Sequence, residues 1–171
     1  SMGAAEGEAF LFAAQHSIKN QQPLLVVASG GGMKMQESII SLNQMTRTTL
    51  AINELKTNKL PYIVLFSDPV AGGITASYAM LGDIHIAEPG ALIAFAGRRV
   101  IEGTVKEELP ENFQKSEHVQ DCGFVDTIIP RKDLPEKIGI LLSILLNKKS
   151  EIKEDKSDKA PENNIENREA S

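Results

Sequence analysis

Short aliphatic runs alternate with longer helical patterns along most of the chain. The run Pro23–Ala28 is typical of a buried strand, and the apolar positions of residues 33–58 recur at helical steps of three, four or seven. A second cycle repeats this layout, with a strand at Pro61–Phe66, a glycine-containing break and a small-residue helix at Ile74–Leu81. Because strands that alternate with helices are typical of crossover units, the pattern predicts an α/β fold.

The long helical pattern also predicts which of its residues face the core: Met35, Ile39, Leu42, Met45, Ile52 and Leu55. The remaining predicted elements are helices at 6–19, 98–107, 114–122 and 134–146 and strands at 84–87, 91–95 and 124–129. Beyond Asn147 only two isolated isoleucines stand among charged residues, Asn, Pro and Ser. The composition therefore predicts a folded domain over residues 1–147 and a charged, disordered tail over residues 148–171.

Length and composition narrow the class of protein. A chain of 171 residues fits one domain, and 42% hydrophobic residues suffice for a sizeable core. No apolar run approaches the roughly 20 residues of a membrane span, and no targeting segment is visible, so we expect a cytoplasmic protein without a membrane segment. A net charge of −5 and 5% aromatic residues argue against nucleic-acid binding. The lone Cys122 excludes an internal disulfide and a four-cysteine zinc site.

Two glycine clusters follow predicted strands and precede predicted helices. They are Gly30-Gly31-Gly32 and Gly72-Gly73. Glycine lets the backbone approach a ligand, and a helix start presents unpaired N–H groups, so two adjacent clusters would form an oxyanion hole. The alternative interpretation, tight turns with close helix packing, fits the spacing equally well.

Other sequence features give weaker evidence of a function. The sequence has no nucleotide-binding GxxxxGK[ST] or GxGxxG motif and no GxSxG nucleophile elbow. His16, His85 and His118 are isolated in the sequence. The Arg98-Arg99 pair is a candidate for binding an anionic ligand, although such pairs commonly form a solvated patch.

Three segments are recognisable as motifs of one family: ASGGGMKMQESIISLNQM (Ala28–Met45), DPVAGGITASYAMLGDIHIAEPGALIAFAGRRVIEGTV (Asp68–Val105) and LPENFQKSEH (Leu109–His118). They closely resemble the carboxyltransferase β subunits of bacterial acetyl-CoA carboxylase, and the resemblance extends from Ser1 to about Leu146. It implies a crotonase (ClpP-like) fold of stacked ββα units. It also implies transfer of a carboxyl group from carboxybiotin to acetyl-CoA, which gives malonyl-CoA for fatty-acid synthesis.

The resemblance implies roles for particular residues. Backbone amides of Gly72, Gly73 and of Gly31 or Gly32 would be the oxyanion donors, while Lys34, with Arg98 or Arg99 as weaker candidates, would meet the CoA phosphates. Lys34 matches an arginine of the family motif SGGAR-M, which is one residue shorter than the segment Ser29–Met35. We expect Lys34 at the first turn of the long helix, where the helix dipole would add to its charge; a solvated lysine is an equal alternative.

The resemblance also implies partner proteins, and the sequence departs from the family pattern in a second respect. The family's four-cysteine zinc ribbon has no counterpart here, so we expect a fold that is incomplete at the N-terminus and a chain with no metal site. Carboxybiotin would arrive on a biotin carboxyl carrier protein, with no biotin bound covalently to this chain. An α subunit would supply a second oxyanion hole in an α2β2 assembly.

Two alternative functions stay open. A ClpP-type serine peptidase would use Ser77 as nucleophile with His85 or His118 as base. A non-catalytic scaffold domain would apply if the chain cannot bind CoA.

Overall fold

A computed structural model describes residues 1–106 and 108–147 of the chain. The predicted tail at residues 148–171 lies outside the described residues. The sheet has four parallel strands in the order β1-β2-β3-β4, and they are β1 (Leu24–Gly30), β2 (Tyr62–Val70), β3 (Ile84–Ala87) and β4 (Thr127–Ile128). The helices are α1 (Ala4–Asn20), α2 (Ile39–Thr57), α3 (Arg98–Val105), α4 (Ser116–Asp121) and α5 (Leu134–Leu145), with short 3₁₀ turns at Met35–Glu37, Ala79–Leu81 and Arg131–Asp133.

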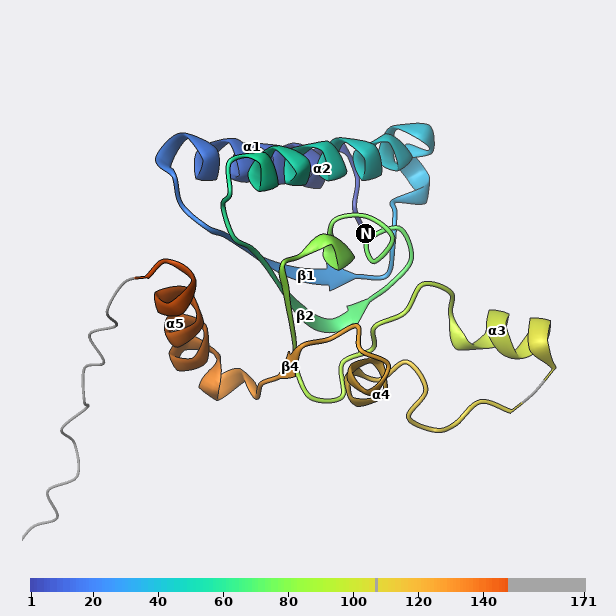
Figure 1. Cartoon of the computed structure of the whole chain (residues 1–171). Helices are drawn as coiled ribbons and strands as arrows, with labels where there is room; N and C mark the ends of the chain where they lie inside the picture. Colours follow the sequence, from blue (N-terminus) through green and yellow to red (C-terminus); the bar gives the residue numbers. More distant parts are fainter. Residues whose placement is uncertain (107, 148–171) are drawn as a thin grey trace, which may run out of the picture.

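The sheet lies between two helical layers, as Figure 1 shows. α1 and α2 lie side by side on one face, where Phe10 and Leu55 pack with Tyr62 in the larger core cluster. α5 covers the other face, where Leu134 packs with Ile63. Successive residues of a strand point to opposite faces, so the continuous apolar run of β2 supplies both clusters. The predicted α/β architecture is confirmed.

The predicted helix at 33–58 begins later than expected. Met2 donates from its N–H to the carbonyl of Gly32 (2.9 Å), and Lys34 donates to the carbonyl of Met2 (2.8 Å), so this segment forms a bridge with the N-terminus. Met2 is only 3% exposed and belongs to the core. The α-helix α2 therefore begins at Ile39.

The predicted core face of this helix is wrong in its first half. Met35, Ile39 and Leu42 are exposed, whereas the buried residues of α2 are Ser41, Gln44, Thr48, Ala51, Ile52 and Leu55. The polar members of this set face α1 closely, since a Cβ placed on Gly7 would lie 2.2 Å from the side-chain oxygen of Gln44. Small and polar residues let the two helices approach, which apolar spacing alone does not reveal.

Three further predicted elements differ from the structure. Residues 72–78 form turns followed by a 3₁₀ turn instead of a helix at Ile74–Leu81. The segment 91–95 makes only isolated bridges through Leu92 and Ile93, and the strand expected at 124–129 is confined to β4.

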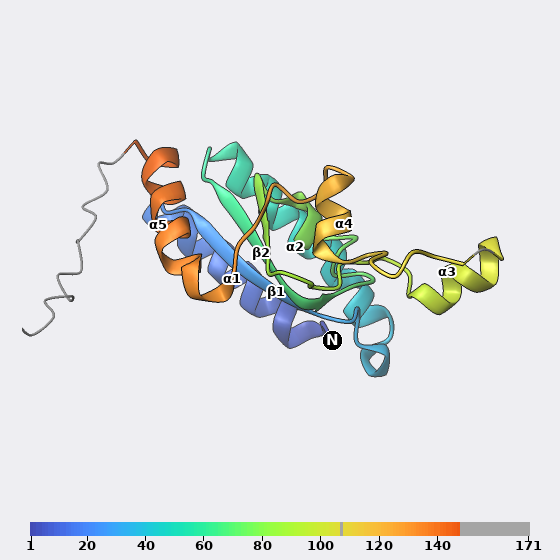
Figure 2. The same ribbon diagram turned by 90° about the horizontal axis from the view of Figure 1, so that it is seen from below.

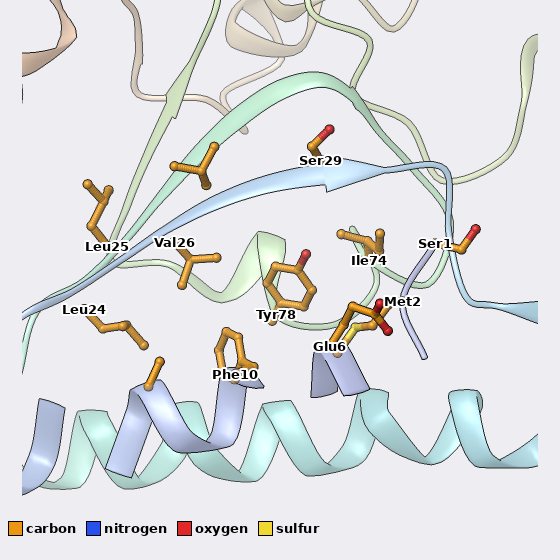
Figure 3. A pocket seen from close by; sticks show the side chains of 12 residues that line it. Ser1, Met2, Glu6, Phe10, Leu24, Leu25, Val26, Ser29, Ile74 and Tyr78 are labelled. Carbon is orange, nitrogen blue, oxygen red and sulfur yellow. The ribbon is translucent and has the colours of Figure 1, made fainter. Parts of the chain in front are cut away.

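β1 forms an edge of the sheet within the described residues. Its Val27 is 60% exposed and its Leu25 is 38% exposed. A pocket of about 340 Å³ lies between α1 and this edge, and Figure 3 shows the side chains of Phe10, Val26 and Tyr78 in it.

Candidate functional site

The two glycine clusters lie side by side at the carboxyl ends of β1 and β2. The strands pair in parallel up to Gly30 opposite Val70, and Ala71 then donates to the carbonyl of Gly30 (2.9 Å). A Cβ built on Gly72 would lie 3.2 Å from the Cα of Gly32 and 3.3 Å from the carbonyl oxygen of Gly31. Backbone therefore packs on backbone here, and only glycine allows so close an approach.

Gly72 serves the turn itself. Its φ of +62° lies in the left-handed region, which favours glycine. Its N–H donates to the carbonyls of Ala94 (3.2 Å) and Phe95 (3.1 Å). The amide of Gly72 is therefore hydrogen-bonded within the chain.

Three other predicted donors keep free amides. Among residues 1–106 and 108–147, the N–H groups of Gly31, Gly32 and Gly73 make no hydrogen bond, and the same holds for Ile74. Met33 lies against Gly73, since a Cβ on Gly73 would be 2.4 Å from Cγ of Met33. The arrangement offers several uncommitted backbone donors where the two strand ends meet, which is what binding of a developing oxyanion requires.

Two hydroxyl groups hold the second glycine turn. Thr75 Oγ1 lies 2.7 Å from the carbonyl oxygen of Gly72 and 2.8 Å from that of Ala94. Ser77 Oγ donates to the carbonyl of Gly73 (2.6 Å). Both side chains are buried, Thr75 with 5% and Ser77 with 2% of its surface exposed. Sequence reasoning missed Thr75; the signal was the Gly-Gly-x-Thr-x-Ser spacing, because hydroxyl residues after a turn commonly bond back to its carbonyls.

The histidines do not form a catalytic pair with Ser77. His85 Nε2 accepts from the N–H of Gly82 (3.1 Å), and burial lowers the pKa of His85 although Asp126 opposes this shift. His118 lies 3.9 Å from the sulfur of Cys122. Because the Ser77 hydroxyl is buried and donates to a carbonyl, the nucleophile and base of the peptidase alternative are not assembled.

Lys34 lies beside the first glycine cluster but outside a helix. The expected position at the first turn of the long helix is wrong, because α2 begins at Ile39. Lys34 Nζ lies 3.1 Å from the carboxylate of Glu37, which raises the pKa of Lys34. The pKa of Glu37 is lowered, first by the N–H of Ala4 and then by Lys34. Lys34 thus forms an ion pair with Glu37, but its side chain remains 40% exposed.

The two arginines have different surroundings. Arg98 pairs with Glu102 (2.8 Å) and donates to the carbonyls of Leu109 and Pro110 (2.9 Å to Pro110). It therefore ties α3 to the returning chain. Arg99 is exposed and has no ion-pair partner among the residues that the structure describes. Figures 1 and 2 show α3 projecting away from the sheet.

A second pocket of about 590 Å³ adjoins the Gly72-Gly73 turn. Its walls include Thr75 and Ala94, which hold the turn, and Gln114, whose side chain donates to the carbonyl of Ala96 (2.8 Å). The rest of the lining is mostly apolar, with Met80, Ile93, Phe95, Val119 and Phe124. A mostly apolar space thus adjoins the residues that hold the turn.

Within residues 1–106 and 108–147, no group of three or more His, Cys, Asp or Glu side chains is placed to hold a metal ion. None of the helices in the described part of the chain is long and apolar enough to cross a membrane.

Comparisons with known sequences identify close relatives. A family model described as the carboxyl transferase domain matches residues 1–165. The chain is 74% identical over 152 residues to the acetyl-coenzyme A carboxylase carboxyl transferase subunit beta of Pelagibacter ubique (strain HTCC1062), covering 89% of this chain and 49% of that relative. It is 56% identical over 146 residues to the protein of the same name from Caulobacter vibrioides (strain NA1000 / CB15N), covering 85% and 48%. The chain spans about half the length of these curated relatives.

Solved structures share the fold at lower identity. Transcarboxylase 12S matches with a TM-score of 0.74 and 23% identity, covering 84% of this chain and 28% of that one. The Pseudomonas malonate decarboxylase heterodimer matches with a TM-score of 0.70 and 20% identity, covering 86% and 65%. These likenesses confirm the predicted crotonase-like α/β fold. The family model, which matches nearly the whole length, shows that the chain belongs to the carboxyl transferase domain family.

Proposed function

We propose that this chain is part of an acetyl-CoA carboxylase carboxyltransferase β subunit. The whole protein would transfer a carboxyl group from carboxybiotin to acetyl-CoA and form malonyl-CoA for fatty-acid synthesis. The names of the 74% and 56% identical relatives support this activity. Residues 1–147 would form the catalytic portion contained in this chain, working in the cytoplasm.

One observation carries the proposal: the free amides of Gly73 and of Gly31 or Gly32 lie where the two glycine clusters meet. Carboxylation at the methyl carbon of a thioester needs an enolate, whose negative charge gathers on the thioester oxygen. Fixed N–H donors at that oxygen stabilise the transition state by about 2.7–4 kcal/mol each. We propose Gly73 as the principal donor and assign Gly72 to the shape of the turn.

The chemistry requires no acid or base from this chain, because the biotin left after release of the carboxyl group would accept the proton that the acetyl methyl group loses. Carboxybiotin on a carrier protein supplies the carboxyl group when it is bound, while this chain binds the thioester, orients it and excludes water. The free glycine amides fit this task, because they are neutral donors for oxygen atoms that carry negative charge. An α subunit, in an α2β2 assembly, would provide the second oxyanion hole.

We propose Lys34 and Arg99 as the cations that meet the CoA phosphates. Arg98 is a weaker candidate than the sequence suggests, because Glu102 and two carbonyls occupy its guanidinium group. Lys34 keeps enough exposed surface to reach a phosphate without leaving Glu37.

Carboxyl transfer by the purified subunits tests this function. The complete β subunit that contains this chain is mixed with an α subunit, acetyl-CoA and carboxybiotin, and malonyl-CoA is measured. We expect product only when both subunits are present. Absence of product from the complete mixture would contradict the proposal, and cleavage of a peptide substrate by the same protein would favour the peptidase alternative.

A further inference from the structure

In the turn after β2, side-chain hydroxyl groups bind the carbonyls of both glycines, and at Gly73 the hydroxyl replaces the helical donor. In a regular helix the carbonyl of Gly73 would accept from the N–H of Ser77, but that N–H points to Ile74 (3.3 Å). The hydroxyl of Ser77 takes its place and donates to Gly73 (2.6 Å). Thr75 likewise bonds the carbonyl of Gly72, which also accepts from the N–H of Ala76 (3.0 Å).

Holding a carbonyl fixes the amide that follows it. The peptide unit is planar and trans, so its C=O and N–H point in opposite directions. The carbonyl of Gly72 points toward Thr75, inside the turn, and the N–H of Gly73 therefore points out of it. By the same argument, Ser77 sets the direction of the Ile74 N–H through the carbonyl of Gly73.

The first glycine cluster lies close to the Gly73 amide. A Cβ on Gly32 would lie 3.9 Å from the nitrogen of Gly73, so the missing side chain of Gly32 leaves space close to this amide. Neither Gly73 nor Ile74 has an acceptor for its N–H among the described residues. Ile74 is only 2% exposed, whereas Gly73 is half-buried, so Gly73 is the free amide that a ligand can reach.

Thr75 also fixes the neighbouring segment. Its hydroxyl lies 2.8 Å from the carbonyl of Ala94, the same carbonyl that accepts from the N–H of Gly72 (3.2 Å). The single hydroxyl hydrogen of Thr75 is therefore shared between the carbonyls of Gly72 and Ala94, and Ala94 also binds the N–H of Gly72. Rotation of the Gly72–Gly73 peptide would break these contacts together.

We propose that Thr75 and Ser77 are positioning residues of the carboxyltransferase site. Thr75 orients the Gly73 amide toward the thioester oxygen, Ser77 holds the next peptide unit through the carbonyl of Gly73, and neither hydroxyl touches the substrate. This inference rests on the proposed function. It gives Ser77 a role that needs no histidine.

Substitution of Thr75 tests the proposal in the complete β subunit assembled with an α subunit. Thr75→Val keeps the shape of the side chain and removes the hydroxyl, whereas Thr75→Ser keeps the hydroxyl. Thr48→Val is the matched control, because Thr48 is fully buried and its hydroxyl donates to the carbonyl of Gln44 (2.9 Å) in α2, away from the turn. Turnover, KM for acetyl-CoA and the thermal unfolding midpoint are measured for each variant.

We expect Thr75→Val to lower kcat by about 10- to 100-fold while the KM changes less than about threefold, because a misdirected donor is lost in the transition state. Thr75→Ser should restore kcat to within about threefold, and Thr48→Val should keep wild-type kcat even if its midpoint falls. If Thr75→Val does not fold, Ser77→Ala replaces it, with an expected loss in kcat of about 10-fold.

Each contrary result has a distinct meaning. Wild-type kcat in the folded hydroxyl-free variant, or an equal loss of kcat in Thr48→Val, would overturn the positioning role while leaving the proposed function intact. A wild-type assembly that forms no malonyl-CoA would overturn the proposed function and this inference with it.

Discussion

Gly32 and Gly72 meet so closely that a Cβ on Gly72 would lie 3.2 Å from the Cα of Gly32. The contact joins two turns that are 40 residues apart in the sequence, and it sets the separation of the free amides on either side of it. Parallel pairing of β1 with β2 delivers both turns to the same edge of the sheet. The geometry of the site therefore depends on the absence of side chains at this contact.

Gly72→Ala should impair both stability and turnover. The left-handed φ of +62° costs an alanine about 1–2 kcal/mol, and the added methyl group would push the two turns apart. We expect a lower free energy of unfolding and a fall in kcat of about 10-fold or more.

Gly90→Ala provides the matched control. Gly90 has a similar φ of +69°, but a Cβ there would meet nothing within 4 Å. Urea unfolding should show a comparable loss of stability, whereas carboxyl transfer should stay at the wild-type rate. Equal losses of turnover in the two variants would mean that backbone strain, and not the contact with Gly32, explains the effect.

Lys34→Ala and Arg99→Ala should each weaken CoA binding by about 2- to 5-fold, the range of a partly exposed ion pair. Each should also reduce the dependence of affinity on salt, because one phosphate contact is lost. Calorimetric titration of the assembled enzyme with CoA at several salt concentrations measures both quantities. Unchanged affinity and salt dependence in both variants would place these side chains on the solvated surface only.

Arg98→Ala should act on structure instead. Arg98 ties α3 to the carbonyls of Leu109 and Pro110, so its removal should loosen this projecting arm. We expect faster amide hydrogen exchange in α3, with the exchange of β2 unchanged as an internal control. Protection of α3 equal to that of the wild type would contradict this role.

The pair of Glu88 and Arg131 should make stability depend on pH. Two guanidinium nitrogens of Arg131 lie 2.5 and 2.8 Å from the Glu88 carboxylate, and Ser67 donates to it as well (2.9 Å). Arg131 lowers the pKa of Glu88 below its usual 4.5. The carboxylate therefore contributes stability above that value, and the contribution is lost as the pH falls through the lower pKa of the folded state.

Comparison of the wild type with Glu88→Gln measures this contribution. Their free energies of unfolding should differ by about 1 kcal/mol at neutral pH, since Arg131 is 79% exposed and water screens the pair. The difference should shrink below pH 4.5, and in an Arg131→Met background it should be smaller at every pH. A difference that is independent of pH would show that the charge of Glu88 is not involved.

The α/β order, the family and the adjacency of the two glycine clusters could be predicted, because they depend on strand periodicity and on motifs that stand in the sequence. The turn at 72–78 could not, since its small residues fit a helix and the departure rests on the Ser77 hydroxyl, which takes the place of a helical N–H at the carbonyl of Gly73. The late start of α2 could not either, because it depends on the bridge between Met2 and Met33. Such contacts are tertiary and leave no periodic signal.

The sequence also could not predict which glycine of the second cluster keeps a free amide. Gly72 and Gly73 are neighbouring residues of the same type, but only Gly73 keeps a free amide. The carbonyls of Ala94 and Phe95 accept the N–H of Gly72. These acceptors come from a segment that the sequence predicts as a strand and that makes only isolated bridges. Prediction of the free donor thus requires the positions of residues that lie more than 20 places further along the sequence.

Binding of two CoA derivatives tests most directly whether the Gly73 amide contacts the thioester oxygen. S-ethyl-CoA lacks the carbonyl oxygen of acetyl-CoA but keeps its size, so the ratio of their dissociation constants reports the hydrogen bonds to that oxygen. In the assembled enzyme we expect acetyl-CoA to bind about 2- to 3-fold more tightly than S-ethyl-CoA, and we expect Thr75→Val to bring the ratio close to one. Equal affinities for the two compounds in the wild type would contradict the account.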